Sequence, residues 1–345
     1  MLDDRKIKVL YAIINSYIIS AEPIGSRTIT KKYDLGVSSA TIRNEMSDLE
    51  DLGYLNKPHS SAGRVPSDKA YRLYVNELLE KKEYRTNTKK KNEIKNILTQ
   101  ESREIEHLLQ NSAKILSALT NYTALAISPQ LNGSTIKHIQ LIPIDDLQIL
   151  MVLVSNTGVV KNSIFRLKES IPENQITILS NFLNEKLKGM SVEKINENVS
   201  GDILKEIYEF KNIIDNIIPI ITQSMEDVDN IDLYSDGINK ILNFPEYNDL
   251  EKAKTFMKFI EDKDAVVELL LNNPISKDVE IRIGDENIYA PIKDCSLLTT
   301  TYKLGDKTIG KIGVIGPTRM DYSAVINTLQ LFSENITEIM DMIMR

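Results

Sequence analysis

The first 82 residues contain the pattern that most restricts the fold of this chain. Apolar residues recur at helical spacing from the N-terminus until Glu22–Gly25 interrupt them. Two further short helical stretches follow, the second of which ends at Gly53, and then a short strand, a turn of small residues and a longer helix. The expected elements are helices over residues 3–19, 27–34 and 38–51, a strand at 54–57, a turn at 59–64 and a helix over 68–82.

This order of elements is that of a winged helix-turn-helix, in which the third helix enters the major groove of DNA. On a helical wheel Ile42, Met46 and Leu49 fall on one side, so we expect them to face the core. The opposite side carries side chains that can match base edges, since Arg bonds guanine, Asn bonds adenine, and Ala or Thr can touch the thymine methyl group. An ordinary solvent-facing helix is the alternative. The predicted DNA contacts in this helix are Ser38, Ser39, Ala40, Thr41, Arg43, Asn44 and Ser47.

The turn after the third helix supplies a second set of candidates. Its small residues permit a close approach of the backbone to DNA, and an arginine at its end suits a narrow minor groove. We therefore add Ser61, Gly63 and Arg64 to the predicted DNA contacts. The alternative is a tight hairpin in which Arg64 pairs with a local carboxylate.

Charge is distributed unevenly along the chain. The whole sequence has 42 Lys and Arg against 49 Asp and Glu, and its net charge of −7 argues against a nucleic-acid partner. Residues 1–91, however, hold 17 basic and 12 acidic residues, so that a basic N-terminal region precedes an acidic remainder. The Lys-rich stretch 83–99 predicts a solvated linker, and a basic arm that strengthens phosphate binding is the alternative.

Beyond residue 100 strand-like runs are separated by a long helical stretch. This order predicts an α+β domain into which a helical segment is inserted. The Ile-rich side of a helix at 203–224 is either a dimer seam or buried within its own subunit, whereas the last helix is expected to pack on its own sheet. The expected strands are 124–127, 136–144, 147–154, 159–165, 278–283, 297–303 and 308–315. The expected helices are 101–120, 250–272 and 320–344, and residues 172–225 are expected to be mostly helical.

The N-terminal motifs resemble a known family. The run VSSATIRNEMSDLEDLGYLNKPHSSAGRVPSDKAYRLYV (Val37–Val75), the preceding PIGSRTITKKYDLG and the distant run Leu242–Leu270 are similar to the heat-inducible transcription repressors HrcA. Serine stands at Ser60 and Ser67 where threonine is expected, which is a conservative change. The resemblance implies a multidomain α+β chain with a winged-helix DNA-binding domain at 1–82, a polar linker at 83–100, a GAF-like domain in two segments (101–170 and 246–345) and an inserted dimerisation domain at 171–245.

The same resemblance implies a function. Such repressors form homodimers that bind an inverted-repeat operator in double-stranded DNA ahead of chaperonin and co-chaperone genes and block their transcription. Heat relieves the repression, and the chaperonin modulates the activity of the repressor. Direct loss of DNA binding on heating is a further hypothesis, because a polar linker joins domains of opposite charge.

No enzyme, metal or cofactor site is recognisable in the sequence. His59, His107 and His138 lack metal-ligand spacing, and Cys295 has no basic partner nearby in sequence, so we expect an inert thiol. Because a GAF-like domain can bind small molecules, a metabolite-responsive regulator or vestigial enzyme is the alternative. A single cysteine, an acidic N-terminus and the lack of an apolar run of 18–20 residues predict a cytoplasmic protein without a membrane span.

Overall fold

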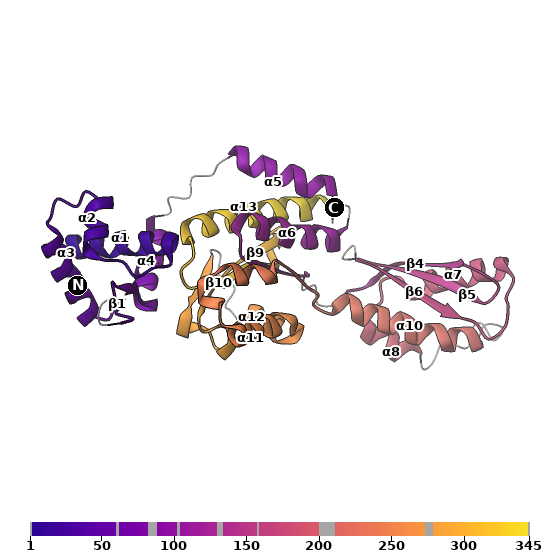
Figure 1. Cartoon of the computed structure of the whole chain (residues 1–345). Coiled ribbons are helices and arrows are strands. Elements are labelled where there is room, and N and C mark those ends of the chain that lie inside the picture. The colour runs from indigo at the N-terminus through magenta and orange to yellow at the C-terminus, as the bar shows by residue number, and fades with distance from the viewer. Residues whose placement is uncertain are drawn as a thin grey trace.

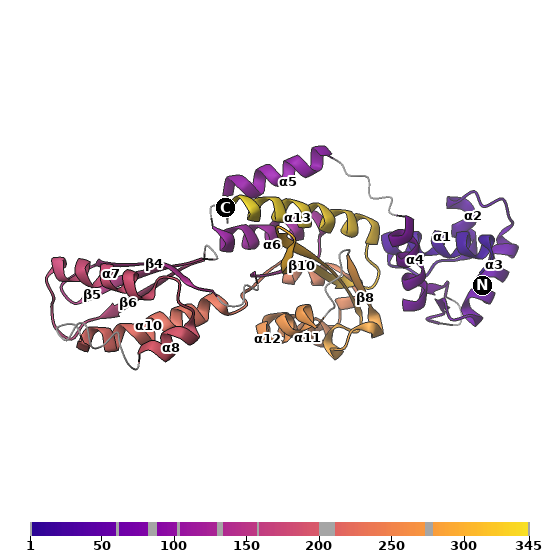
Figure 2. The same cartoon turned by 180° about the vertical axis from the view of Figure 1, so that it is seen from behind.

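The computed structural model describes residues 2–59, 62–81, 88–101, 104–129, 134–156, 159–199, 211–272 and 279–343. These residues form three units in a row, with the two outer units at opposite ends of the central one (Figure 1, Figure 2). In the described part of the chain no helix is both long and apolar enough to span a membrane. We term the units the head (residues 2–81), the body (88–129 and 231–343) and the insert (134–230).

The head consists of four helices and a small antiparallel ladder. Local signals set the ends of its helices, since Asp3 caps the first and Ser38 caps the third with side-chain oxygens that accept from Lys6 N and Thr41 N. Ile24 forms a bridge with Arg64, so a third extended segment joins the ladder. The elements are α1 (Asp4–Ser20), α2 (Ser26–Lys32), α3 (Ser39–Asp51), β1 (Leu55–Asn56), β2 (Val65–Pro66) and α4 (Asp68–Lys81).

The core of the head is apolar and continuous with that of the body. Ile42, Met46 and Leu49 are buried, as the helical wheel predicted, against Leu10 and Ile13 of α1. Full burial of one such side chain contributes about 1.5–3 kcal/mol. The orientation of α3 is therefore fixed by its apolar side, and its opposite side is left to solvent.

The body is built on a five-stranded antiparallel sheet in the order β7-β3-β10-β9-β8. Both faces are covered, because Ala124 and Ala126 point into one apolar core while Leu125 and Ile127 point into another. The strands are β3 (Thr123–Ile127), β7 (Leu233–Asp236), β8 (Glu280–Ile283), β9 (Cys295–Leu304) and β10 (Lys307–Pro317). One face packs on α6 (Ile105–Thr120) and α13 (Tyr322–Ile343), with α5 (Thr88–Glu101) on the outer side of these two helices (Figure 1). The other face packs on α11 (Leu250–Glu261), α12 (Lys263–Leu271) and the 3-10 helices η2 (Ile238–Asn243), η3 (Pro245–Tyr247) and η5 (Ala290–Ile292).

The C-terminal helix packs on the sheet of its own body, as the sequence predicted. Phe332 and Ile336 are fully buried in the core between α13 and the sheet. Two hydrogen bonds from side chains of α13 to β9 support this contact: Ser333 Oγ donates to Thr301 O at 2.6 Å, and Thr337 Oγ1 accepts from Lys303 N at 3.0 Å.

The segment expected as a polar linker is in its described part a docked helix. Ile94 and Leu98 of α5 are buried in the core of the body, which a wholly solvated linker would not allow. Lys91 pairs with Glu334 at 2.7 Å, and Lys95 pairs with Glu338 at 2.5 Å, both on α13. Lys91 and Lys95 thus neutralise carboxylates of α13 and do not form a basic arm toward DNA.

The insert has its own sheet and its own core. Strands β4 (Ile136–Pro143), β5 (Gln148–Ser155) and β6 (Val160–Arg166) form an antiparallel sheet in that order. Helices α7 (Glu173–Leu187), α8 (Val192–Val199) and α10 (Lys211–Asp229) share an apolar core with this sheet.

This grouping corrects the expected domain boundaries. The boundary between residues 170 and 171 separates strands 136–165 from α7, yet Ile139 of β4 and Leu183 of α7 lie in the same core. At the other end, β7 pairs with β3 in the sheet of the body, so residues 233–236 do not belong to the insert. The mean polarity of a segment cannot show which sheet its strands join, since that depends on long-range pairing.

The Ile-rich side of α10 is buried within its own subunit. Ile214, Ile217 and Ile221 are fully buried in the core of the insert, so the second of the two alternatives holds for this part of the helix. Leu204 and Ile207, which belong to the same expected helix, lie outside the described residues.

Candidate nucleic-acid interface

Helix α3 presents a polar side to solvent. Ala40, Arg43, Asn44 and Ser47 are exposed, whereas Thr41 is partly buried at the edge of this surface. These are the residues that the wheel placed opposite the apolar side. The helix therefore offers a row of small and hydrogen-bonding groups on a rigid, buried support.

The serines at the start of α3 have structural partners. Ser38 Oγ accepts from Thr41 N at 3.1 Å and lies 3.0 Å from Thr41 Oγ1, as a helix cap does. Ser39 Oγ lies 3.1 Å from Ser26 Oγ of α2, so it links the two helices. Both predicted contact residues thus also hold the local fold.

Glu45 and Asp48 of α3 are paired with cations inside the head. Glu45 is buried and accepts from Arg5 Nε at 2.6 Å, while Lys6 Nζ lies 2.9 Å from Glu45 and 3.1 Å from Asp48. The hydrogen bond that Lys6 donates to Glu45 is the main cause that raises the pKa of Lys6 above its ordinary value. Glu45 was not among the predicted functional or core residues, although it lies on the same side of the helical wheel as Ile42 and Leu49.

Gly63 and Arg64 have roles within the fold. Arg64 N donates to Ile24 O at 2.8 Å, and Ile24 N donates to Arg64 O at 2.9 Å. A Cβ on Gly63 would lie 2.5 Å from the carbonyl carbon of Ile24, so a side chain at this position is sterically excluded. Ser60 and Ser61 lie outside the described residues.

The Arg64 side chain pairs with a carboxylate at the far end of α3. Its Nη2 lies 2.5 Å from Glu50 Oε2, and the side chain is only 18% exposed. This is the geometry of the hairpin alternative. The pair also removes the charge of Glu50 from the surface beside α3.

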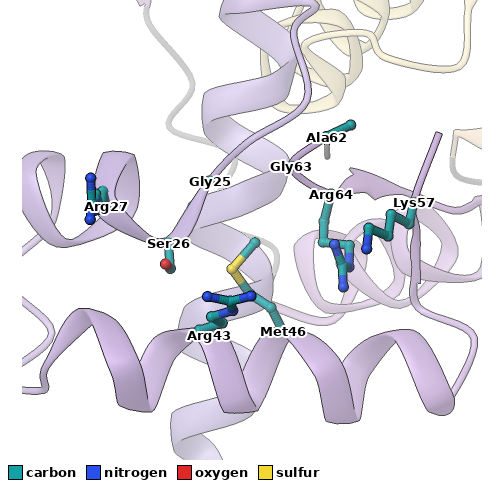
Figure 3. A pocket seen from close by; sticks show the side chains of 9 residues that line it. All are labelled: Gly25, Ser26, Arg27, Arg43, Met46, Lys57, Ala62, Gly63 and Arg64. Carbon is teal, nitrogen blue, oxygen red and sulfur yellow. The ribbon is translucent and has the colours of Figure 1, made fainter. Parts of the chain in front are cut away.

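A hollow of about 440 Å³ opens between α2, α3 and the β1–β2 segment (Figure 3). Figure 3 shows Arg43 rising from α3, with Lys57 and Arg64 on the other side of the hollow. None of the nine described residues around it is acidic. Arg27 and Lys57 were not among the predicted contacts, although their basic side chains beside small residues were visible in the sequence. The lining residues are Gly25, Ser26, Arg27, Arg43, Met46, Lys57, Ala62, Gly63 and Arg64.

Comparison with known proteins places the chain in a family. Residues 106–326 match the family model described as the HrcA protein C terminal domain. The chain is 43% identical over 339 residues to the heat-inducible transcription repressor HrcA of Alkaliphilus metalliredigens, and the match covers 98% of each sequence. The chain belongs to the HrcA family.

Other members of the HrcA family extend the match to the head. The protein of the same name from Clostridium tetani is 43% identical over 341 residues, covering 98% of this chain and 96% of its own. A crystal structure described as that of a hypothetical protein shares the fold, with a TM-score of 0.70 at 22% identity over 99% of this chain and 98% of that one. The HrcA family model covers most of the body and the insert, while the full-length relatives include the head and α3.

Two features of this HrcA-family chain bear on metal and thiol chemistry. Among the described residues no group of three or more His, Cys, Asp and Glu is placed to hold a metal ion. Cys295 is buried in the body, where burial raises the pKa of its thiol to about 12.

Proposed function

We propose that this chain is a heat-inducible transcription repressor whose head is a winged helix that places α3 in the major groove of an operator. The exposed row of Ala40, Arg43, Asn44 and Ser47 on a helix with a fully buried opposite side carries this proposal. The β1–β2 segment is the wing, and the body is the GAF-like domain. Family membership supports this assignment, since the named relatives are transcription repressors.

Base recognition is assigned to Arg43 and Asn44. Both side chains are exposed near the N-terminal half of α3, where a recognition helix contacts base edges. Arg43→Ala and Asn44→Ala should each weaken operator binding by about 1–3 kcal/mol, and Asn44→Ala should leave affinity for unrelated DNA nearly unchanged.

A fluorescence-anisotropy titration with the DNA upstream of the chaperonin operon tests this assignment. Asn76→Ala on α4 is the matched control, because it removes another exposed asparagine of the head. If neither Arg43→Ala nor Asn44→Ala changes the preference for operator over unrelated DNA, α3 is not the recognition helix.

The dimer is proposed to form through the open face of the insert sheet. All three described helices of the insert share the core on the other face, and on the open face Ile142, Leu150 and Ile164 lie opposite one another across β4, β5 and β6. Ile142 is 41% exposed and Ile164 is 66% exposed. A second copy would cover this apolar row and supply the second head that an inverted repeat requires.

Sedimentation equilibrium tests the dimer surface. Ile164→Lys should shift the protein toward the monomer, since a charge on this row would be buried without a partner. Ile178→Lys is the control, because Ile178 is another exposed isoleucine of the insert, 53% exposed, that lies on α7. Equal association by both variants would remove the sheet face from the dimer.

Modulation by the chaperonin is the remaining part of the proposal. The repressor is kept active by the chaperonin, and heat removes this support when misfolded proteins occupy the chaperonin. Footprinting of the same upstream DNA with and without added chaperonin tests it, and protection that is identical in both conditions would contradict it.

A further inference from the structure

The hollow beside α3 gathers positive charge that its surroundings compensate only in part, at Arg64. Arg27 comes from α2, Arg43 from α3, and Lys57 and Arg64 from the β1–β2 segment (Figure 3). Within the described part of the chain Arg27, Arg43 and Lys57 form no ion pair, and Arg64 alone has a carboxylate partner. Like charges around one concave surface repel one another, so an anion bound between them would stabilise the arrangement.

The guanidinium of Arg64 is incompletely satisfied. Its Nη2 is held by Glu50, whereas its Nε is buried and finds no acceptor among the described residues. A buried donor without an acceptor is uncommon and points to a missing partner. Once the Arg64 guanidinium leaves Glu50, it could donate to an anion with several oxygen atoms in the hollow together with the neighbouring cations.

We propose that the hollow binds a backbone phosphate of the DNA and that Arg64 exchanges its ion pair with Glu50 for this phosphate. The inference rests on the proposed function, because α3 in the major groove brings a DNA strand past the hollow that Arg43 lines. A phosphodiester matches the site chemically, since its oxygens accept charge-assisted hydrogen bonds from arginine and lysine. Gly25, Ala62 and Gly63 leave room for its approach between the charged side chains.

Two consequences distinguish this site from base recognition. Phosphates are the same in every sequence, so Arg27 and Lys57 should contribute equally to operator and unrelated DNA. Glu50 competes with the phosphate for Arg64, so its charge should weaken DNA binding. The structure thus separates backbone binding in the hollow from base recognition by Asn44.

The test uses anisotropy titrations of the full-length protein with an operator duplex and a scrambled duplex of equal length. Lys57→Gln and Arg27→Gln should weaken binding to both duplexes by the same factor. Because one phosphate contact adds about −0.9 to the slope of log K against log salt, that factor should shrink about 3.5-fold between 50 and 200 mM salt. Lys258→Gln removes an exposed lysine of α11 in the body and should change neither titration.

Glu50 gives the second arm of the test. Glu50→Gln should bind both duplexes more tightly and with a steeper salt dependence, and Arg64→Gln added to it should abolish the gain. Weaker binding by Glu50→Gln would overturn the exchange, because Glu50 would then position Arg64 for DNA. Thermal unfolding of each variant checks that the head is folded.

The remaining outcomes separate this inference from the proposed function. Unchanged binding by both Lys57→Gln and Arg27→Gln, or a loss confined to the operator, would overturn the phosphate site even if Asn44→Ala abolishes operator preference. If neither the wild type nor any variant preferred the operator duplex over the scrambled duplex, the proposed function itself would be overturned. Replacing chloride by inorganic phosphate at equal ionic strength should change the DNA affinity of wild type and of Lys57→Gln by the same factor. If phosphate instead displaced DNA only from the wild type, the hollow would be a site for free phosphate.

Discussion

Arg319 of the body donates from Nη1 to the main-chain carbonyl of Ile18 in the head at 2.9 Å. The same guanidinium donates from Nε to Glu246 at 2.5 Å and lies 5.5 Å from the centre of the Phe244 ring. Helix α1 has no basic residue in its last turn, so Arg319 supplies the cation that the C-terminal end of that helix favours. One side chain of the body thus completes a helix of the head.

Replacement of Arg319 should loosen the head from the body. Arg319→Gln removes a mostly buried cation from Glu246 and from the carbonyl of Ile18, and a hydrogen bond to a charged group is worth about 1.5–3 kcal/mol. Faster limited proteolysis between head and body should follow, together with a lower midpoint of unfolding by urea. Arg319→Lys should recover part of the loss, because lysine retains the charge but not the forked geometry. Digestion at the wild-type rate would show that the head is held by other contacts.

The same contact bears on direct sensing of temperature. The head also meets the body where Arg72 donates from Nη2 to Ile281 O at 2.7 Å and where the rings of Tyr71 and Tyr322 lie 5.8 Å apart. If release of the head on heating ends operator binding, Arg319→Gln should lose binding at a lower temperature than wild type. Anisotropy measured during a slow temperature ramp checks this, with unrelated DNA as the reference. If wild type and Arg319→Gln lost operator binding at the same midpoint temperature, release of the head would not be the cause of that loss.

Gly63→Ala should disturb the β1–β2 segment. The new Cβ would lie 2.5 Å from main-chain atoms of Ile24, so the bridge between Ile24 and Arg64 must open or shift. Overpacking of this kind costs about 1–3 kcal/mol, and DNA affinity should fall with it because Arg64 is displaced. Gly25→Ala is a matched control in the same hollow, since its Cβ meets no atom within 4 Å. Thermal unfolding of both variants measures the difference, and equal stability would show that the segment can shift freely.

Local patterns were sufficient to predict the elements of the head. The caps and the spacing of apolar residues predicted α3 and its buried side, because both depend on residues within one or two turns. Arrangements that depend on distant partners were not predictable. Pairing of Arg64 with a carboxylate was foreseen as an alternative, but the identity of its partner Glu50 and the steric need for Gly63 depend on segments that only the fold brings together.

The predicted linker and the predicted bounds of the insert differ from the structure for the same reason, which is dependence on distant partners. Helix α5 has a polar average composition, yet two apolar residues on one side, Ile94 and Leu98, are enough to dock it on the body. Strands β4–β6 resemble those of the body in composition, and only their mutual pairing shows that they belong with α7 and α10. The charges of α5 depend on distant partners as well, because Lys91 and Lys95 pair with acidic residues of α13.

Docking of α5 should weaken in acid. Lys95 and Lys91 hold the pKa of Glu338 below its ordinary value. The ionised carboxylate therefore stabilises the docked helix at pH values above that ordinary pKa, and this contribution is lost as the pH falls through the lowered pKa. Amide hydrogen exchange in α5, corrected for intrinsic rates, should therefore be faster at low pH than at neutral pH. Glu338→Gln should reduce this pH dependence, whereas Leu98→Ala should weaken docking at every pH because it removes apolar contact. Identical protection at both pH values in wild type would show that the ion pairs contribute nothing.

Cys295 should be inert while the body is folded. Its thiol is buried, and burial raises its pKa to about 12, so at pH 8 only about one molecule in ten thousand carries the reactive thiolate. Tyr247 Oη lies 2.8 Å from Cys295 Sγ, and this hydrogen bond acts in the opposite direction by lowering the pKa. Tyr247→Phe should therefore not accelerate reaction with a disulfide reagent unless it also opens the core. We expect slow labelling in native protein and complete labelling in urea, and prompt labelling of native protein would place the thiol at the surface. Because labelling then requires opening of the body, its rate on heating distinguishes unfolding of the body from release of the head alone.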